Sequence, residues 1–395
     1  MHRAAVSLLS GTALFLGLAA TAPALAAPCG GTFTDFITAM KAEAVQAGIS
    51  PADTDRFFAG ITQDPKVLKA DRSQGVFRKP FTEFARSLIS QNRIDNGKAN
   101  ARKHAALFAR AESDYGIPPG ILLAFWAFET DFGSFQGDFN TANALATLAH
   151  DCRRPALFQP QLLAAIKLWQ QGMFDPATTT GAWAGEIGMV QMLPADILAR
   201  GVDGDGDGRV SLKTSVPDAI LSGAAMLRDL GWRKGEPWLQ EVALPPSLPW
   251  EKTGLRSTLT GPEWATLGVT ARTGTLADLP ASLILPEGRK GPAFLAYPNF
   301  QTLFEWNQSF VYVTTAAYFA TRLGGAPVFS AGNPDPQLSL DDTKRLQEKL
   351  QQRGYDVGGV DGILGTNTRD AVRQEQLRLG LPADAWPTLD LLEAL

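Results

Sequence analysis

The chain has 395 residues, a formal net charge of −4, two cysteines and three histidines. This length is enough for two or three domains with sizeable cores. The acidic balance without a long basic run argues against a nucleic-acid-binding protein and against a polybasic membrane patch. The histidines show no metal-ligand or catalytic-triad spacing, so nothing in the sequence indicates a catalytic cysteine.

The first 26 residues have the features of a secretory signal peptide. Arg3 precedes an apolar stretch at 13–20, and small residues at 24–26 offer a cleavage site. The apolar stretch is too short and too rich in alanine for a stable membrane span, and no later segment approaches one. We therefore expect an exported, soluble, periplasmic protein without a transmembrane anchor.

Cys29 and Cys152 both remain after cleavage at this site. In an oxidising compartment, two cysteines most simply form one disulfide, which would tie the mature N-terminus to the middle of the chain. The alternative is two separate free thiols.

Residues from about 32 to 230 show mostly helical patterns. Apolar residues recur at helical spacing in the segments 33–40 and 162–169. Ser50 and Pro51 have the order of a helix start, with the serine as cap and the proline at the first helical position.

Glu129 ends an unbroken apolar run at 121–128. Pro118 and Pro119 are suited to open a helix there, and Gly133 is suited to end it with a left-handed cap. A helix that is apolar on every face is buried, so its last turn would bring a carboxyl group to the edge of a hydrophobic core. Desolvation raises the pKa of such a group, and a protonated carboxylic acid can protonate the leaving oxygen of a glycosidic bond. The alternative is a Glu that faces solvent at a helix end.

A second candidate segment spans 182–194 and contains two closely spaced glycines. Gly185 and Gly188 would let the backbone approach a ligand or a neighbouring helix. Gln191 would present an amide that both donates and accepts hydrogen bonds, as sugar hydroxyl and acetamido groups require. The alternative is a glycine-rich turn with Gln191 on the surface.

Prolines and glycines become frequent at 235–298, where short apolar runs at 282–285 and 293–297 predict brief strands and loops. A single helix is then expected over 300–323. The segment 324–337 has the composition of a linker.

A compact helical module is expected over 338–395. Its first helix is expected at 341–353, and a second helix is expected to extend through Gln376. Its size suits a binding module better than an enzyme.

Two motifs together, Glu-Thr-Asp-Phe-Gly at 129–133 and Gly-Glu-Ile-Gly-Met-Val-Gln-Met-Leu-Pro at 185–194, resemble the membrane-bound lytic transglycosylase B family. The resemblance extends from about Pro65 to Leu323 and includes the segments 181–185, 203–210, 216–220 and 306–309. It implies a mainly α protein whose catalytic region, 28–323, has a lysozyme-like helical core with a small insertion of loops and short strands. It also implies cleavage of the MurNAc–GlcNAc β-1,4 bond of peptidoglycan, with glycan strands as the partner.

The resemblance implies that Glu129 is the sole catalytic acid and then base. It would protonate the leaving oxygen while the substrate's N-acetyl group assists at the anomeric carbon. It would then deprotonate the MurNAc 6-hydroxyl, closing a 1,6-anhydro ring without water. A group with both roles needs an intermediate proton affinity, and substrate assistance removes the need for a second carboxylate. No cofactor is expected for catalysis.

Further substrate-binding positions follow from the resemblance. Gln191 matches a glutamine that binds glycan, and Tyr312 matches a nearby tyrosine. Trp306 and Asn307 match a Tyr-Asn pair. Trp306 keeps an aromatic face for sugar stacking but lacks the hydroxyl, so we expect no polar role there. Ala182 stands where some members carry a serine near the catalytic Glu.

Glu186 stands where many relatives have alanine. It could be a second acid in the cleft or an outward-facing salt-bridge partner, and we favour the second interpretation. A lysozyme-type hydrolase with Asp131 or Glu186 as second carboxylate is one rival function. However, a residue two positions from Glu129 points elsewhere on a regular helix. A non-catalytic wall-binding protein that has kept the fold is the other rival.

Acidic residues alternate at 203–208 as at the start of an EF-hand calcium loop, but the twelfth position is Thr214 instead of Glu. The resemblance implies a longer loop that binds a structural calcium or sodium ion. Its ligands would be the carboxylates of Asp203, Asp205, Asp207 and Asp218 and the peptide carbonyl of Arg209. The alternative is a solvated turn.

The C-terminal module resembles the small peptidoglycan-binding domain of cell-wall enzymes, in the segments 346–347, 354–355, 360–365 and 368–372. We expect three helices. Tethering a weak glycan binder would raise the enzyme's effective concentration on an insoluble polymer. Oligomeric state is left open by the sequence, and a monomer is our working expectation.

Overall fold

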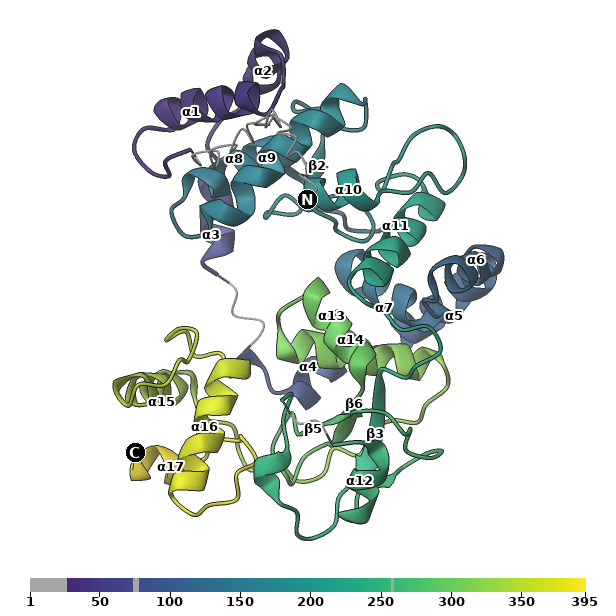
Figure 1. Ribbon diagram of the computed structural model, residues 1–395, viewed down its shortest axis with the longest axis vertical. Helices are drawn as coiled ribbons and strands as arrows, with labels where there is room; N and C mark the ends of the chain where they lie inside the picture. The colour runs from purple at the N-terminus through teal and green to yellow at the C-terminus, as the bar shows by residue number, and fades with distance from the viewer. Residues whose placement is uncertain (1–26, 74–77, 257–258) are drawn as a thin grey trace, which may run out of the picture.

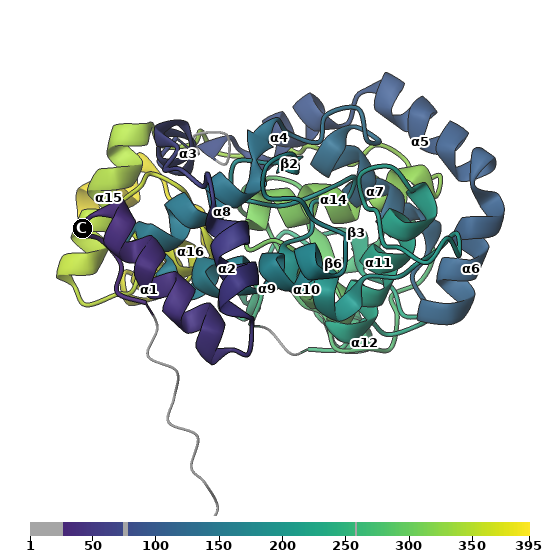
Figure 2. The same cartoon turned by 90° about the horizontal axis from the view of Figure 1, so that it is seen from above.

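The computed structural model describes residues 27–73, 78–256 and 259–395, and helices dominate it (Figures 1 and 2). The expected mainly α fold is therefore confirmed. The predicted signal peptide lies outside the described residues. Within these three ranges, every helix falls short of the length or the apolar character that a membrane span requires.

An N-terminal lobe is built by five helices and lies at the top of Figure 1. These helices are α1 (Phe33–Gln46), α2 (Pro51–Phe58), α3 (Pro65–Asp71), α8 (Thr141–His150) and α9 (Pro155–Gln170). The predicted start of α2 is confirmed, since the Ser50 side chain accepts a hydrogen bond from the Asp53 N–H at 3.0 Å.

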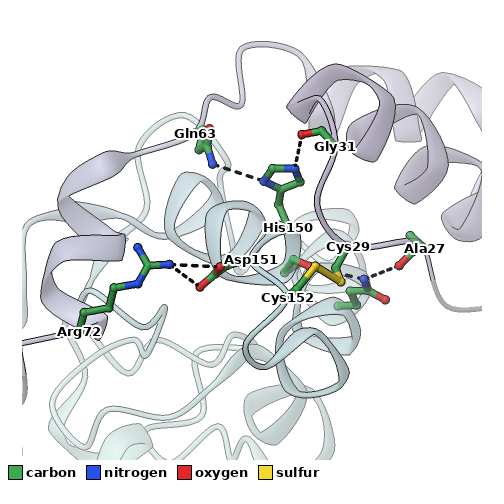
Figure 3. The surroundings of a disulfide bond; sticks show 10 residues. Ala27, Cys29, Gly31, Gln63, Arg72, His150, Asp151 and Cys152 are labelled. Atoms are coloured by element: carbon green, nitrogen blue, oxygen red, sulfur yellow. Dashed lines mark hydrogen bonds and ion pairs between the residues drawn. A yellow bond between two sulfur atoms is a disulfide. The ribbon is translucent and has the colours of Figure 1, made fainter.

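The predicted disulfide between Cys29 and Cys152 is confirmed, and it fastens the N-terminal segment to the end of α8 (Figure 3). His150 supports the same junction. Its Nε2 lies 3.2 Å from the Gly31 carbonyl oxygen, and its Nδ1 lies 3.3 Å from the Gln63 side chain. Covalent and polar links therefore join the segments that precede α1 and α3 to the end of α8.

The central body carries most of the remaining helices. They are α4 (Phe81–Leu88), α5 (Gln91–Lys103), α6 (Ala105–Tyr115), α7 (Pro119–Thr130), α11 (Val216–Asp229), α13 (Pro298–Trp306) and α14 (Phe310–Leu323). Helix α10 (Pro194–Arg200) packs against both α9 of the lobe and α11 of the body. A two-stranded antiparallel ribbon, β1 (Phe139–Asn140) with β2 (Thr180–Gly181), lies between α7 and α10 in the chain.

Helix α7 is the centre of this body, because α5, α6, α11 and α14 all pack against it. Residues 121–127 are all buried, which agrees with their apolar sequence. Gly120 permits close contact with α14: a Cβ there would lie 2.8 Å from the Ala320 carbonyl oxygen.

The prediction of a single helix over 300–323 is wrong, because the segment forms α13 and α14 with a break between them. Asn307 is extended, and its Oδ1 accepts a hydrogen bond from the Ser309 N–H at 2.9 Å. The Ser309 side chain then caps α14 by accepting from the Tyr312 N–H at 3.4 Å. These local side-chain bonds compete with the helix and end it.

The predicted insertion of short strands is confirmed as a four-stranded antiparallel sheet of order β4-β3-β6-β5, with its own small core. In this sheet Ala296 pairs with both Leu239 and Ser282. The elements are β3 (Leu239–Ala243), the 3₁₀ helix η2 (Trp250–Lys252), α12 (Gly261–Thr266), β4 (Thr270–Ala271), β5 (Ser282–Ile284) and β6 (Phe294–Ala296).

The C-terminal module has three helices, α15 (Leu340–Gln352), α16 (Thr366–Arg378) and α17 (Leu389–Ala394), around a separate core. The module is attached to the rest of the protein by direct side-chain contacts with the central body as well as by the preceding segment. Arg369 donates to the Pro286 carbonyl oxygen at 2.6 Å and stacks over Phe310, with 4.7 Å from its guanidinium carbon to the ring centroid. Arg289 forms an ion pair with the buried Asp384 at 3.0 Å.

We predict that replacing both disulfide cysteines with serine lowers the free energy of unfolding by about 2–4 kcal/mol, because the bond closes a loop across 123 positions. Urea unfolding of the double variant and the oxidised protein measures this difference. A reducing agent should have no effect on the variant. Equal free energies for the two proteins would show that the disulfide contributes nothing to stability.

Candidate active site

Glu129 lies in the last turn of α7, where the buried helix reaches its end. The helix was expected to end with a left-handed cap at Gly133. It ends earlier, because Asp131 and Phe132 already have positive φ angles of 50° and 59°. The Asp131 N–H and Phe132 N–H bond back to the carbonyl oxygens of residues 127 and 126. Residues other than glycine rarely adopt positive φ angles, so surrounding contacts must hold this backbone conformation.

Two side-chain contacts hold the end of α7. The buried Thr130 hydroxyl donates to the Met189 carbonyl oxygen at 2.7 Å, and its oxygen accepts from the Gly133 N–H at 2.9 Å. Asp131 forms an ion pair with Arg93 of α5 at 3.1 Å. The carboxylate of Asp131 is therefore bound to α5, which agrees with the expectation that it points away from Glu129.

Two donors from separate helices meet on one oxygen of Glu129. The Tyr312 hydroxyl donates to Glu129 Oε1 at 2.5 Å, and the Trp306 indole N–H donates to the same atom at 3.3 Å. Our expectation of no polar role for Trp306 is therefore wrong, since its indole nitrogen supplies a donor that the ring position alone did not reveal. Because both bonds use Oε1, Oε2 is the oxygen that can carry the exchangeable proton.

Burial raises the pKa of Glu129 from its ordinary value of 4.5 to about 7. The Tyr312 hydrogen bond opposes this shift, the nearby negative charge of Glu186 adds to it, and the Trp306 hydrogen bond opposes it slightly. Burial also raises the pKa of Tyr312, and Glu129 raises it further. Tyr312 therefore stays a donor over the whole range in which Glu129 titrates.

The segment 185–192 forms a tight turn beside the end of α7. Gly185 and Gly188 have φ angles of 89° and 81°, and a Cβ at either would clash with a neighbouring chain segment. The expected close approach of the backbone is therefore confirmed. Gln191 has a φ of 51°, and its side-chain amide donates to the Gly188 carbonyl oxygen at 2.7 Å. Gln191 lies on the turn that is hydrogen-bonded to Thr130 through the Met189 carbonyl oxygen. Among the described residues, its side chain makes no hydrogen bond to Glu129.

A groove of about 850 Å³ is lined by residues of the N-terminal lobe, the central body and the C-terminal module. Trp306 and Asn307 line it, as does Glu186. Our preference for an outward-facing Glu186 is therefore wrong: its side chain lines the groove and one of its oxygens is buried. The module contributes residues 363–365, Arg369 and Trp386, which the sequence did not associate with this site.

Three of the expected metal ligands converge. One carboxylate oxygen each from Asp203, Asp205 and Asp218 lies within 4.8 Å of the others, and Asp218 is buried. Asp207 lies outside this cluster. Its oxygen accepts from the Arg209 N–H at 2.8 Å. Three converging carboxylates are hard oxygen ligands of the kind that calcium prefers.

Comparison with known proteins identifies two regions. Residues 32–321 match the family model described as "Transglycosylase SLT domain", and residues 339–395 match the one described as "Putative peptidoglycan binding domain". The chain belongs to the transglycosylase SLT domain family. A curated member from Escherichia coli (strain K12), "Membrane-bound lytic murein transglycosylase B", is 29% identical over 236 residues. The alignment covers 58% of this chain and 63% of that relative, so the chain spans under two thirds of its length.

Solved structures agree with membership of the SLT domain family. SltB3 from Pseudomonas aeruginosa, in complexes with NAG-anhNAM-pentapeptide and NAG-NAM-pentapeptide, is 36% identical, with TM-scores of 0.83 and 0.84. The matches cover 92% of this chain and 99% and 100% of those chains. The Escherichia coli lytic transglycosylase Slt35 in complex with calcium shares the fold, at 23% identity and a TM-score of 0.63, over 73% of this chain and 92% of that one.

We predict that Glu129→Gln stabilises the protein at alkaline pH. The folded-state pKa of Glu129 is raised, so its contribution to stability is complete below about 4.5 and is lost as pH rises through about 7. The free energy of unfolding of the variant should therefore exceed that of the wild type by up to about 3 kcal/mol near pH 8.5, and this difference should disappear towards pH 4.5. Chemical unfolding at several pH values measures it. A difference independent of pH would contradict the raised pKa.

Proposed function

We propose that this protein is a peptidoglycan lytic transglycosylase that cleaves the MurNAc–GlcNAc β-1,4 bond and releases 1,6-anhydro-MurNAc. The observation that carries the proposal is the Glu129 carboxyl group, desolvated at the end of α7 and held through one oxygen by Tyr312 and Trp306. Membership of the SLT domain family supports the same reaction class.

In the proposed first step, neutral Glu129 donates its proton from Oε2 to the oxygen that leaves the anomeric carbon. A pKa of about 7 keeps a large fraction of the group protonated near neutrality. As the proton leaves, the charge that develops on the carboxylate is stabilised by the Tyr312 hydroxyl and the Trp306 N–H on Oε1. These donors are already in place, so they need not reorganise during the reaction.

In the proposed second step, the Glu129 carboxylate removes the proton of the MurNAc 6-hydroxyl, which attacks the anomeric carbon. Participation of the substrate's N-acetyl group replaces a second protein carboxylate. The ion pair of Asp131 with Arg93 supports this single-carboxylate scheme, because it holds Asp131 away from the reacting atoms. Trp306, Asn307 and Gln191 are the proposed glycan-binding residues.

We infer that the C-terminal module binds the same polymer as the catalytic region. Its residues line the groove together with Trp306 and Asn307, so a glycan strand in the groove would touch both parts. The match to a putative peptidoglycan binding domain supports this role. A substrate in the cell wall is consistent with the proposed export to the periplasm.

We further propose that a calcium or sodium ion binds between Asp203, Asp205 and Asp218 with a structural role. The site lies at the N-terminal end of α11, where Asp218 also accepts hydrogen bonds from the Gly204 N–H at 2.8 Å and the Ser211 N–H at 2.7 Å. An ion there would neutralise three converging negative charges.

We predict that wild-type protein releases anhydro-MurNAc products from sacculi, whereas Glu129→Gln binds sacculi and releases none. The amide keeps the shape of the side chain but cannot donate a proton and then recover it. Mass spectrometry of the digest provides the measurement. Reducing-end MurNAc, which is heavier by one water, would identify a hydrolase instead. Turnover by the variant would remove Glu129 from the mechanism.

We predict that Tyr312→Phe shifts the alkaline limb of the kcat/KM profile upwards by about one pH unit. The lost hydrogen bond stabilises the carboxylate, so its removal raises the Glu129 pKa further. Initial rates on soluble glycan strands across pH 5 to about 9.5 measure the limb. Tyr318→Phe is the matched control, because it removes a hydroxyl group from the same helix that is bonded to the Phe329 N–H and not to Glu129. An unshifted limb would show that Tyr312 does not tune Glu129.

We predict that calcium raises the melting temperature of the wild type and that Asp205→Asn loses this response, because it removes one of three charges that would bind the ion. Asp207→Asn should retain most of it. Thermal unfolding with excess calcium and with chelator measures the effect. Identical melting temperatures for the wild type under both conditions would exclude an ion at this loop.

A further inference from the structure

The side chain of Glu186 lines the groove but plays no part in the proposed acid and base steps. It follows Gly185 in the tight turn, and its own carbonyl oxygen accepts from the Ala182 N–H at 2.9 Å. A Cβ at position 181 would lie 2.0 Å from that carbonyl oxygen, so the backbone there is closely packed. The next residue, Ile187, is bridged to Met192. Glu186 is therefore held in place by the fold and is not a free surface side chain.

One oxygen of this carboxyl group has no protein partner. Within the described part of the chain, Glu186 Oε2 is buried and accepts no hydrogen bond. Leaving such an acceptor unpaired destabilises the folded protein, and more so when the acceptor is charged. Buried polar atoms are nearly always paired, so this exception needs an explanation, and a partner in the groove would supply one.

The neighbouring charged groups do not satisfy Glu186. Burial raises the pKa of Glu186, and its own backbone N–H, the charge of Arg154 and the Ala184 N–H oppose this shift. Arg154 is ion-paired with the buried Asp71 and stacks over Phe158, with 5.0 Å between guanidinium carbon and ring centroid. Ionised Glu129 carries charge of the same sign, and neutral Glu129 makes no hydrogen bond to Glu186 Oε2 in the described part of the chain. Glu186 Oε2 is therefore available to a donor group of a molecule that occupies the groove.

The lining beside Glu186 indicates the chemistry of that donor. Trp183 lies three residues before Glu186, and Trp306 lines the groove as well. Indole faces pack against the flat and weakly polar surfaces of sugars and amide groups. A carboxylate accepts hydrogen bonds and cannot donate them, so its partner must be a donor, and an amide N–H, which only donates, matches it best.

We propose that Glu186 is a specificity-determining residue that accepts a hydrogen bond from an amide N–H of peptidoglycan. The N–H belongs either to an N-acetyl group of a sugar or to the amide that begins the stem peptide on the lactyl group. The inference rests on the proposed substrate and adds a recognition residue to it. Glu186 acts in binding, whereas the proton transfers stay with Glu129.

Calorimetric titration tests this with two ligands that lack the MurNAc–GlcNAc bond, so that binding is measured apart from cleavage. They are the GlcNAc–MurNAc disaccharide and the same disaccharide with a pentapeptide. We expect Glu186→Ala to raise the Kd of the pentapeptide ligand by about tenfold or more. Glu186→Gln, which keeps an acceptor oxygen, should lose less. Glu112→Ala, on the exposed outer face of α6, is the matched control and should bind as the wild type does.

The two ligands distinguish the source of the N–H. An equal loss for both assigns it to a sugar acetamido group, and a loss confined to the pentapeptide ligand assigns it to the stem peptide. Unchanged Kd values for both ligands would overturn the proposal. So would a large fall in kcat at unchanged Kd, because that pattern marks a second catalytic carboxylate.

Protein stability separates recognition from a structural role. Removal of an unpaired buried oxygen should leave the melting temperature unchanged or higher, so a lower melting temperature of Glu186→Gln would also overturn the proposal. If Glu186→Ala does not fold, the glutamine variant alone decides through its Kd. The Kd and melting-temperature measurements test recognition independently of the reaction. A hydrolysis product from sacculi would therefore reject the proposed reaction and leave the proposed recognition role untouched.

Discussion

The burial of α7 on all sides is the constraint on which the candidate site depends. Four helices pack against it, so its position and rotation are fixed by hydrophobic contacts along seven successive buried residues. The last turn then has to present Glu129 beside α13 and α14. A carboxyl group in that place loses much of its hydration, and this loss outweighs the two hydrogen bonds that favour its charged form. The raised pKa is therefore a consequence of helix packing.

Polar contacts fix the positions of the chain segments around Glu129. The left-handed residues at the end of α7 turn the chain back towards the 185–192 turn, and Thr130 joins the two through Met189. The break between α13 and α14 brings the Trp306 indole and the Tyr312 hydroxyl to the same carboxylate oxygen. Three chain segments thus meet at Glu129. Two of them use backbone conformations that cost energy, as is common where function competes with stability.

Much of this arrangement could be predicted from local patterns. The uninterrupted apolar run predicted a buried helix, and the closely spaced glycines predicted a tight backbone approach. The broken helix at Asn307 could not be predicted from apolar spacing, because side-chain bonds to the backbone decide it. The donor role of Trp306 and the inward direction of Glu186 also escaped the sequence, since both depend on which segments the tertiary fold brings together. The docking of the module through Arg369 is a tertiary feature of the same kind.

The central claim is that Glu129 stays protonated near neutrality because it is buried. The most direct measurement is a pH titration of the protein with ¹³C-labelled glutamate carboxyl groups by NMR, with Glu129→Gln used to assign the signal. An apparent pKa near 7 for this one group is predicted. A value near 4.5, the ordinary value for glutamate, would contradict the claim.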